Sequence, residues 1–542
     1  MKKLLFILLI FSSQFIFSQE EALVFFADKE DVAASLANPI TILTQAAINR
    51  KSAQGISIDE RDVPLNEIYK TQINSAPGVT VLAKSKWLNA VYVRGNYANI
   101  NSLSNLPFVT EVEFMNKDLN RSFPKSTPKD KFEIEKQRRV EYNYGAARNQ
   151  VEMIGVDQLH QNGYNGEGIT VAFMDNGYPN VLSNPAFSHV RNEGRLLGYY
   201  DFVARSQNTD GTGNHGAHTF SDAAAIVENS NPDRAFVGTG PKASYYLFVT
   251  EDSYSESPVE EAYWVEALER ADSLGVYVSN TSLGYQDFDN PNYAHSYEDL
   301  DGQTTIAARG ANASFDKGMI TVTSAGNDGN GFGYVATPGD APGAFTIGAV
   351  DSAGMYVDFS SYGPNSAGVI KPDVMAQGRY SAIVNQFGQV DYSNGTSFSS
   401  PITAGAVASL WQAVPHLKND VVMQAIRESA SLYNSPTYNM GYGIPDFGVA
   451  LTSLLQLSTE QYMQETLFAV YPNPVSSEIN ILFPKNADQA IFTLYNILGK
   501  KVLQAKTTPL KNSVDIAYLP SGMYIASITS NNKTTSFKII KE

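Results

Sequence analysis

The chain has 542 residues, which is room for about two to four domains and at least one large core. Its formal net charge of -16 argues against a nucleic-acid or anionic-membrane partner, because both bind basic surfaces. It contains no cysteine, which excludes disulfides, thiolate metal sites and a cysteine nucleophile. We therefore expect any nucleophile in this protein to be an oxygen atom.

The N-terminus has the pattern of an export signal. Two lysines precede an apolar run from Leu4 to Phe11, and a polar exit follows. We expect residues 1–18 to be cleaved from a protein that leaves the cytoplasm and is secreted or held on the outer cell surface. A membrane anchor is the alternative, but the apolar run is shorter than the roughly 20 residues that span a bilayer.

Residues 19–140 are predicted to form a small α+β domain followed by a linker. Short alternating segments such as Val109–Phe114 indicate half-buried strands. The stretch Asn120–Arg139 is basic and polar and holds two prolines, with little that could be buried. It is typical of an exposed linker and of a place where proteases cut.

Residues 141–456 combine apolar strand-like runs with helical segments. This alternation predicts an α/β domain, with a mostly parallel sheet covered by helices on both faces. Chemistry in such sheets gathers at the carboxyl ends of the strands, so the polar residues that close these runs are candidates. The strand-like runs are Ile169–Asp175, Ala243–Thr250, Gly275–Gly284, Met319–Asn327 and Ala344–Val350, and the helical segments include Gly216–Val227 and Ser257–Leu274.

Residues 467–542 differ from the domain before them. They contain repeated short alternating runs divided by turn signals such as Asn-Pro, Leu-Gly and Pro-Ser-Gly. This pattern predicts a small β-sandwich.

Four polar residues could carry chemistry. Ser397 stands at a helix entrance, His215 follows a glycine-rich turn, and Asp175 and Asn327 close strand-like runs. Each has an ordinary explanation when it is taken alone: a helix cap, a capping or core histidine, and two turn residues. A serine hydroxyl becomes a nucleophile only with a base within hydrogen-bond reach and a group that holds that base.

The segments around these residues, in the chain order Asp, His, Asn, Ser, are "MDNG", "NHGAH", "SAGN" and "NGTSFSSP". They resemble the four signature segments of the subtilisin-like serine proteases, and this order separates that family from other triad enzymes. The resemblance covers roughly residues 150–450. Further similar segments are Ser279–Tyr285, Thr346–Pro364 and Lys371–Gly378.

The resemblance implies a role for each of the four residues. Ser397 would be the nucleophile and His215 the general base, with Asp175 holding the imidazole. The side-chain amide of Asn327 and the N–H of Ser397 would bind the oxyanion. Pro401 is expected in the first helical turn, where a missing N–H costs little. A structural place is expected for His218, His295 and His416.

The same resemblance implies a substrate class. Ser282, Leu283 and Gly284 would pair with an extended polypeptide as an added strand. The expected function is that of a secreted serine endopeptidase with an acyl-enzyme intermediate. A catalytically inactive subtilase-fold surface binding protein is the alternative from another class, and an esterase or peptide ligase is not distinguished by the sequence.

Partners follow from the flanking segments. Residues 19–140 occupy the place of a subtilase propeptide, although a stable accessory domain is the competing interpretation. The tail, with "YPNPVSSEINI" and "LPSGMYIASI", resembles the C-terminal sorting domains of the type IX secretion system in Bacteroidetes. A carbohydrate-binding or adhesive sandwich is the alternative. We expect polypeptide substrates, the protein's own propeptide and the secretion machinery as partners, and a monomer.

No cofactor is required by this chemistry, and no metal site is assigned. The segment between Gly284 and Asn327 nevertheless looks like an acidic insertion relative to compact subtilisins. Glu298, Asp299 and Asp301 stand close together in it, and clustered carboxylates are calcium ligands. Calcium binding there is a hypothesis, with a solvated acidic loop as its alternative.

Overall fold

The computed structural model describes residues 19–119, 142–466, 468–484, 487–530 and 533–542. The predicted export signal and the whole of the predicted linker, Asn120–Arg139, lie outside these residues. Within the described part of the chain, no helix is both long and apolar enough to cross a membrane.

The N-terminal domain is a four-stranded antiparallel sheet in the order β2-β3-β1-β4. Alternate residues of its strands face two different cores. Val24 and Val91 pack with Ile100 beneath the domain's own helices, whereas Leu23 and Tyr92 face the next domain. The strands are β1 Gln19–Phe26, β2 Val79–Ser85, β3 Ala90–Asn96 and β4 Val109–Phe114, and the helices are α1 Val32–Ala37, α2 Gln45–Gln54, α3 Glu67–Asn74 and α4 Tyr97–Ser102.

The middle domain is built on a seven-stranded sheet in the order β13-β12-β11-β10-β5-β9-β6. All neighbouring strands run parallel, so their carboxyl ends meet at one edge. The strands are β5 Thr170–Asp175, β6 Leu196–Asp201, β9 Ser244–Val249, β10 Val278–Thr281, β11 Ile320–Ser324, β12 Ala344–Val350 and β13 Val374–Gln377.

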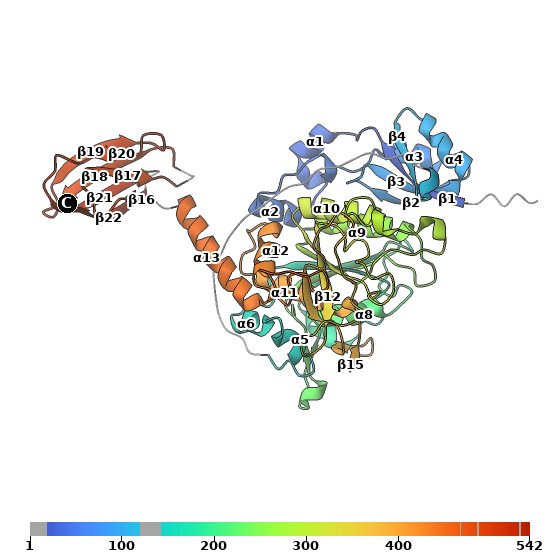
Figure 1. Cartoon of the computed structure of the whole chain (residues 1–542). Helices are drawn as coiled ribbons and strands as arrows, with labels where there is room; N and C mark the ends of the chain where they lie inside the picture. Colours follow the sequence, from blue (N-terminus) through green and yellow to red (C-terminus); the bar gives the residue numbers. More distant parts are fainter. Residues whose placement is uncertain (1–18, 120–141, 467, 485–486, 531–532) are drawn as a thin grey trace, which may run out of the picture.

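Helices cover both faces of this sheet, which confirms the predicted architecture (Figure 1). Phe173 of β5 packs with Phe220 and Ile402 on one face, and the neighbouring Met174 packs with Trp264 on the other. A sheet buried on both faces explains why its strands read as continuous apolar runs. The covering helices are α8 His215–Ala224 and α11 Thr396–Trp411 on the first face, and α9 Val259–Leu274 and α10 Ile306–Asp316 on the second.

Several predicted elements are shorter in the structure, and two of them have a clear local cause. The helix predicted to Val227 ends at Ala224, because Ile226 and Val227 form β7, which pairs with β8 Phe236–Val237. The strand predicted from Gly275 begins at Val278, because Gly275 ends α9 with φ 88°, a conformation that favours glycine. The remaining elements are α5 Arg148–Glu152, α6 Val156–Gln161, α7 Ser188–Asn192, β14 Ser381–Val384, β15 Val390–Ser393, α12 Asn419–Glu428 and α13 Phe447–Thr466.

The N-terminal domain lies on α9 and α10 (Figure 1) and is joined to them by buried charges. Asp272 of α9 pairs with Lys51 at 2.8 Å and also with Arg50, while Lys317 pairs with Asp62 at 2.7 Å. All five side chains are at most 1% exposed. Because each charge has an opposite partner, the desolvation cost of burying it is offset.

The C-terminal domain begins beyond the end of α13 (Figure 1). It consists of two antiparallel sheets, β16-β17-β20 and β19-β18-β21-β22, which share a core that includes Ile481, Phe492 and Ile528. This is the predicted β-sandwich. Its strands are β16 Ala469–Tyr471, β17 Glu478–Leu482, β18 Ala490–Asn496, β19 Lys501–Thr507, β20 Ser513–Asp515, β21 Gly522–Ser530 and β22 Lys533–Lys541.

Candidate active site

Three neighbouring strands bring three of the predicted site residues, Asp175, Ser282 and Asn327, to one edge of the parallel sheet. Strand β5 ends at Asp175 and lies next to β10, after which Ser282 follows. Strand β11 lies on the other side of β10 and leads to Asn327. Met174 is in register with Thr281, and Thr281 with Thr323, so the three strand ends are level.

The carboxylate of Asp175 holds the imidazole of His215. The Nδ1 atom of His215 lies 2.9 Å from Oδ1 and 3.0 Å from Oδ2. Asp175 is 1% exposed and also accepts the N–H of Asn176 at 2.8 Å and the hydroxyl of Thr219 at 3.1 Å. These donors satisfy the oxygens of a carboxylate that water scarcely reaches. The contact with Nδ1 keeps the proton on that nitrogen and leaves Nε2 as an acceptor.

The pKa of His215 is raised above its ordinary value. Burial alone would lower the pKa, but the negative charge of Asp175 and the hydrogen bond with it outweigh that effect. His215 begins α8, and its ring lies against Phe398 with 6.0 Å between ring centroids. The imidazole is therefore placed beside the first turn of α11.

Ser397 is the second residue of α11 and is 8% exposed. The residue that caps the helix is Gly395, whose φ of 147° favours glycine and which has no side chain that could bond the helix end. The Ser397 hydroxyl donates to the carbonyl of Ser282 at 3.3 Å rather than to His215. Its N–H is one of those at a helix start that have no partner within the helix.

Pro401 is not in the first turn of the helix, and that prediction was wrong. The helix begins at Thr396, so Pro401 stands in the second turn, where its missing N–H would have bonded the carbonyl of Ser397. The hydroxyl of Ser282 donates to that carbonyl instead, at 2.8 Å.

Asn327 is exposed, and its amide is held in one orientation by Thr396. Its Oδ1 accepts the N–H of Thr396 at 2.9 Å and the hydroxyl of Thr396 at 3.0 Å. Since a backbone N–H can only donate, the atom that faces it must be the amide oxygen. The Nδ2 group is thus left as a free donor next to Gly395 and the start of α11.

The segment Ser282–Gly284 runs from buried to exposed along its length. The next residue, Tyr285, donates its N–H to the carbonyl of Thr337 at 2.8 Å, and Ser324 donates its hydroxyl to the carbonyl of Leu283 at 3.3 Å. Among the described residues, the N–H groups of Ser282, Leu283 and Gly284 have no partner.

The other predicted residues lie elsewhere. His218 contacts Gln386 at 2.8 Å, His416 contacts Ser458 at 3.1 Å, and His295 lies between Glu261 at 2.7 Å and Lys117 at 3.3 Å. In the acidic insertion, each of two carboxylates has its own partners. These are Lys117 for Asp299 and the N–H groups of Gln303 and Thr304 for Asp301.

No group of three histidine, aspartate or glutamate residues able to hold a metal occurs in the part of the chain that the structure describes. Calcium binding by Glu298, Asp299 and Asp301 therefore stays a prediction without a preformed site.

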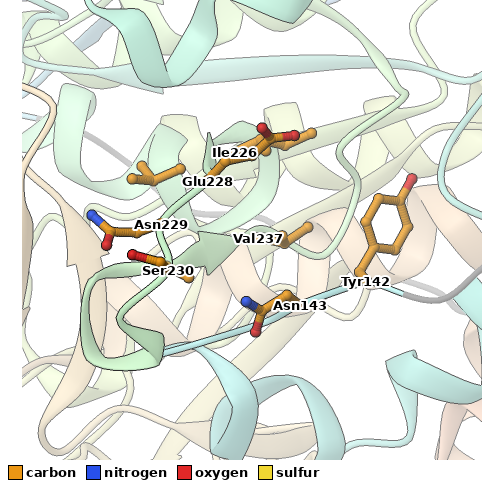
Figure 2. Close-up of a pocket in the computed structure, with 9 residues that line it drawn as sticks. Tyr142, Asn143, Ile226, Glu228, Asn229, Ser230 and Val237 are labelled. Carbon is orange, nitrogen blue, oxygen red and sulfur yellow. The ribbon is translucent and has the colours of Figure 1, made fainter.

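A cavity of about 540 Å³ (Figure 2) lies apart from the candidate active site. It is lined by Ile226 and Val227, which follow the end of α8, whereas His215 begins that helix. A helix of 10 residues is about 15 Å long, so the cavity is separate from the site around His215. Its remaining lining residues are Tyr142, Asn143, Glu228, Asn229, Ser230, Ala235 and Val237.

Sequence reasoning missed the residues that hold the predicted ones in place. Thr219 is the clearest case, because it stands four residues after His215 on the same helix face and both contact Asp175. Thr396 directly precedes Ser397 and orients Asn327. The spacing of Thr219 could have been noticed in the sequence, whereas the contact of Thr396 depends on the tertiary fold.

Comparison with protein-family models gives three matches along the chain. The Subtilase family model matches residues 166–443, the Peptidase S8 propeptide domain of Bacteroidota matches residues 21–132, and the Secretion system C-terminal sorting domain matches residues 469–542. The subtilase match spans more than half of the chain, and the chain belongs to the subtilase family.

Similar proteins include Subtilisin Savinase of Lederbergia lenta, 25% identical over 292 residues that cover 54% of this chain and 94% of that protein. Subtilisin DY of Bacillus licheniformis is 29% identical over 287 residues, which cover 52% of this chain and 90% of that protein. A crystal structure of MycP1 with the N-terminal propeptide removed covers 56% of this chain and 96% of its own, with a TM-score of 0.43 and 20% identity.

These findings confirm the predicted class of protein. It is a serine-type endopeptidase of the subtilase family that is secreted or held at the cell surface. It carries a propeptide domain and a secretion sorting domain around its protease domain.

Proposed function

We propose that Asp175, His215 and Ser397 form the catalytic triad and that the enzyme hydrolyses peptide bonds through an acyl-enzyme. The observation that carries this proposal is the pairing of His215 with the buried Asp175, with the imidazole beside the turn that bears Ser397. Nδ1 is occupied by the carboxylate, so Nε2 is the base.

In the first half of the reaction, the Ser397 hydroxyl turns from Ser282 toward Nε2 of His215 and attacks the substrate carbonyl carbon. Its proton passes to Nε2 as the new C–O bond forms. The resulting oxyanion receives hydrogen bonds from Nδ2 of Asn327 and the N–H of Ser397, at the positive end of α11. The imidazolium then gives its proton to the amine nitrogen, the C–N bond breaks, and the acyl-enzyme remains.

In the second half, water attacks the ester carbon while His215 accepts its proton, and that proton returns to the oxygen of Ser397 as the acid leaves. The carboxylate of Asp175 holds the imidazole throughout and stabilises the imidazolium. The free N–H groups along Ser282–Gly284 support binding of the substrate as an extended strand. Recognition through main-chain bonds suits polypeptides of many sequences.

Hydrolysis of an internally quenched peptide by the processed enzyme tests this proposal. Ser397→Ala should lower kcat on the order of 10⁶-fold, the loss that follows removal of this serine in subtilisin itself. His215→Ala should lower kcat by a similar factor. The matched control is His218→Ala, which removes the other histidine of the same helix and should keep kcat/KM within a few-fold. Equal losses in the two histidine variants would contradict the proposal.

A further inference from the structure

Two serines face each other across the junction of β10 and α11. The hydroxyl of Ser282 donates to the carbonyl of Ser397 at 2.8 Å, and the hydroxyl of Ser397 donates to the carbonyl of Ser282 at 3.3 Å. Their exposed fractions are 3% and 8%, so water competes little for these bonds. The contact therefore holds both the backbone and the resting hydroxyl of residue 397.

The position of Pro401 explains why this contact exists. An α-helical carbonyl normally accepts the N–H four residues later, and for Ser397 that residue is Pro401, which has no N–H. A buried carbonyl without a donor would be costly. Ser282 supplies the donor, so the start of α11 is attached to the end of β10 by side-chain bonding at the residue that bears the nucleophilic hydroxyl.

Asn280 extends the attachment to the next turn of the helix. It is fully buried, with Nδ2 3.1 Å from the hydroxyl oxygen of Ser282 and Oδ1 accepting the hydroxyl of Ser400 at 2.8 Å. The only proton of the Ser282 hydroxyl goes to Ser397, so this oxygen can only accept from Asn280. The amide orientation is therefore fixed, and β10 is bonded to α11 at residues 397 and 400.

We infer that Asn280 and Ser282 are positioning residues for the nucleophile. With the backbone of Ser397 fixed, its hydroxyl moves between two acceptors by rotation about χ1 alone: the carbonyl of Ser282 at rest and Nε2 of His215 during attack. This inference rests on the proposed role of Ser397. Neither positioning residue needs to touch the reacting atoms with its side chain.

The test compares rate constants for phosphonylation by a small alkyl fluorophosphonate, which reports on Ser397 without a peptide bound along 282–284. Ser282→Ala should slow phosphonylation and kcat about 10-fold and leave KM nearly unchanged, as expected for loss of one bond that orients the nucleophile. The matched control is Ser409→Ala on the same helix. Ser409 is also fully buried and donates to the carbonyl of Thr239 at 2.7 Å.

The control should show a comparable fall in thermal midpoint but rates within about twofold of the parent, because its bond is remote from Ser397. The double variant Asn280→Ala, Ser282→Ala should be no slower than the slower single variant, since both act through one network. Should Ser282→Ala fail to fold, Ser400→Ala removes only the outer bond to Asn280 and should slow phosphonylation about threefold.

The outcomes separate the two claims. Absence of phosphonylation at Ser397 in the parent enzyme would contradict the proposed function itself. A parent that reacts normally, with Ser282→Ala or Ser400→Ala no slower than Ser409→Ala, would overturn the positioning role alone. Losses that multiply in the double variant would show that Asn280 and Ser282 act independently, which also overturns it.

Discussion

The Nδ1 atom of His215 lies 2.9 Å from one carboxylate oxygen of Asp175 and 3.0 Å from the other. Because the carboxylate is 1% exposed, its charge acts on the imidazole with little screening by water. The pair therefore stabilises the protonated imidazole while keeping Nε2 available in the neutral form.

The first prediction concerns the pH dependence of kcat/KM. Burial lowers the pKa of His215 and Asp175 raises it by more, so the net pKa is above its ordinary value of 6.5. Because the base must be neutral, activity should be lost as pH falls through a midpoint above 6.5. In Asp175→Asn only burial remains, so the midpoint should move below 6.5 while kcat falls roughly 10⁴-fold. An unmoved midpoint in the variant would contradict this account of the pair.

The second prediction concerns Thr219, whose hydroxyl lies 3.1 Å from Oδ2 of Asp175 and 3.2 Å from the carbonyl of Gly216. Thr219→Val keeps the shape but removes a donor to a buried charge, and we expect kcat/KM to fall about 10-fold. The control is Thr403→Val, which removes a buried hydroxyl bonded only to the carbonyl of Ser399. Equal values of kcat/KM in the two variants would mean that the Thr219 hydroxyl donates to the carbonyl of Gly216 rather than to Asp175.

The third prediction concerns the oxyanion donor. Asn327→Ala should lower kcat about 100- to 1000-fold with little change in KM, because the lost bond forms in the transition state. Thr396→Val removes only one of the two bonds that orient the amide and should cost several-fold. The measurement is kcat and KM of both variants on one peptide. A larger loss of kcat in Thr396→Val than in Asn327→Ala would be incompatible with Asn327 as the oxyanion donor.

The fourth prediction concerns docking of the propeptide domain. Burial raises the pKa of Asp62, but the ammonium groups of Lys51 and Lys317 outweigh it and hold the pKa below its ordinary value. The stabilisation from a lowered carboxyl pKa is present above about pH 4 and is lost as pH falls through the lowered value. Protection of β1 and β3 from hydrogen exchange, measured in the unprocessed Ser397→Ala protein, should therefore decrease below about pH 4.

Lys317→Met in that same background should weaken docking already at neutral pH. It leaves Asp62 buried with only Lys51 as its partner, and breaking a buried pair costs about 3–5 kcal/mol. The exposed pair of Arg148 and Glu152 offers the control, since Arg148→Met should change protection by little. Unchanged protection in Lys317→Met would show that apolar contacts alone hold the domain.

Local pattern was enough to predict the sheet, its two helical layers and the residues that end its strands, such as Asp175. The resemblance to a family added roles for these residues. What could not be predicted depends on register between segments far apart in the chain. Lys117 reaches Asp299, and Asn280 reaches Ser400, only once the strands and helices have packed.

The misplaced Pro401 shows the same limit at a helix start. The Ala-rich run after Pro401 indicated a helix, but its first turn contains Ser and Thr residues that are weak helix formers. In the structure, tertiary bonds with Ser282 and Asn280 stabilise the first and second turns of the helix. The helix propensities of one segment give no information about bonding partners from other parts of the chain.

Mass spectrometry of the processed enzyme after reaction with a fluorophosphonate tests most directly whether Asp175, His215 and Ser397 act as one site. We predict a single adduct on the peptide that contains Ser397, and no adduct in His215→Ala although the serine is still present. An adduct on another residue, or undiminished labelling of Ser397 without the imidazole, would contradict the account.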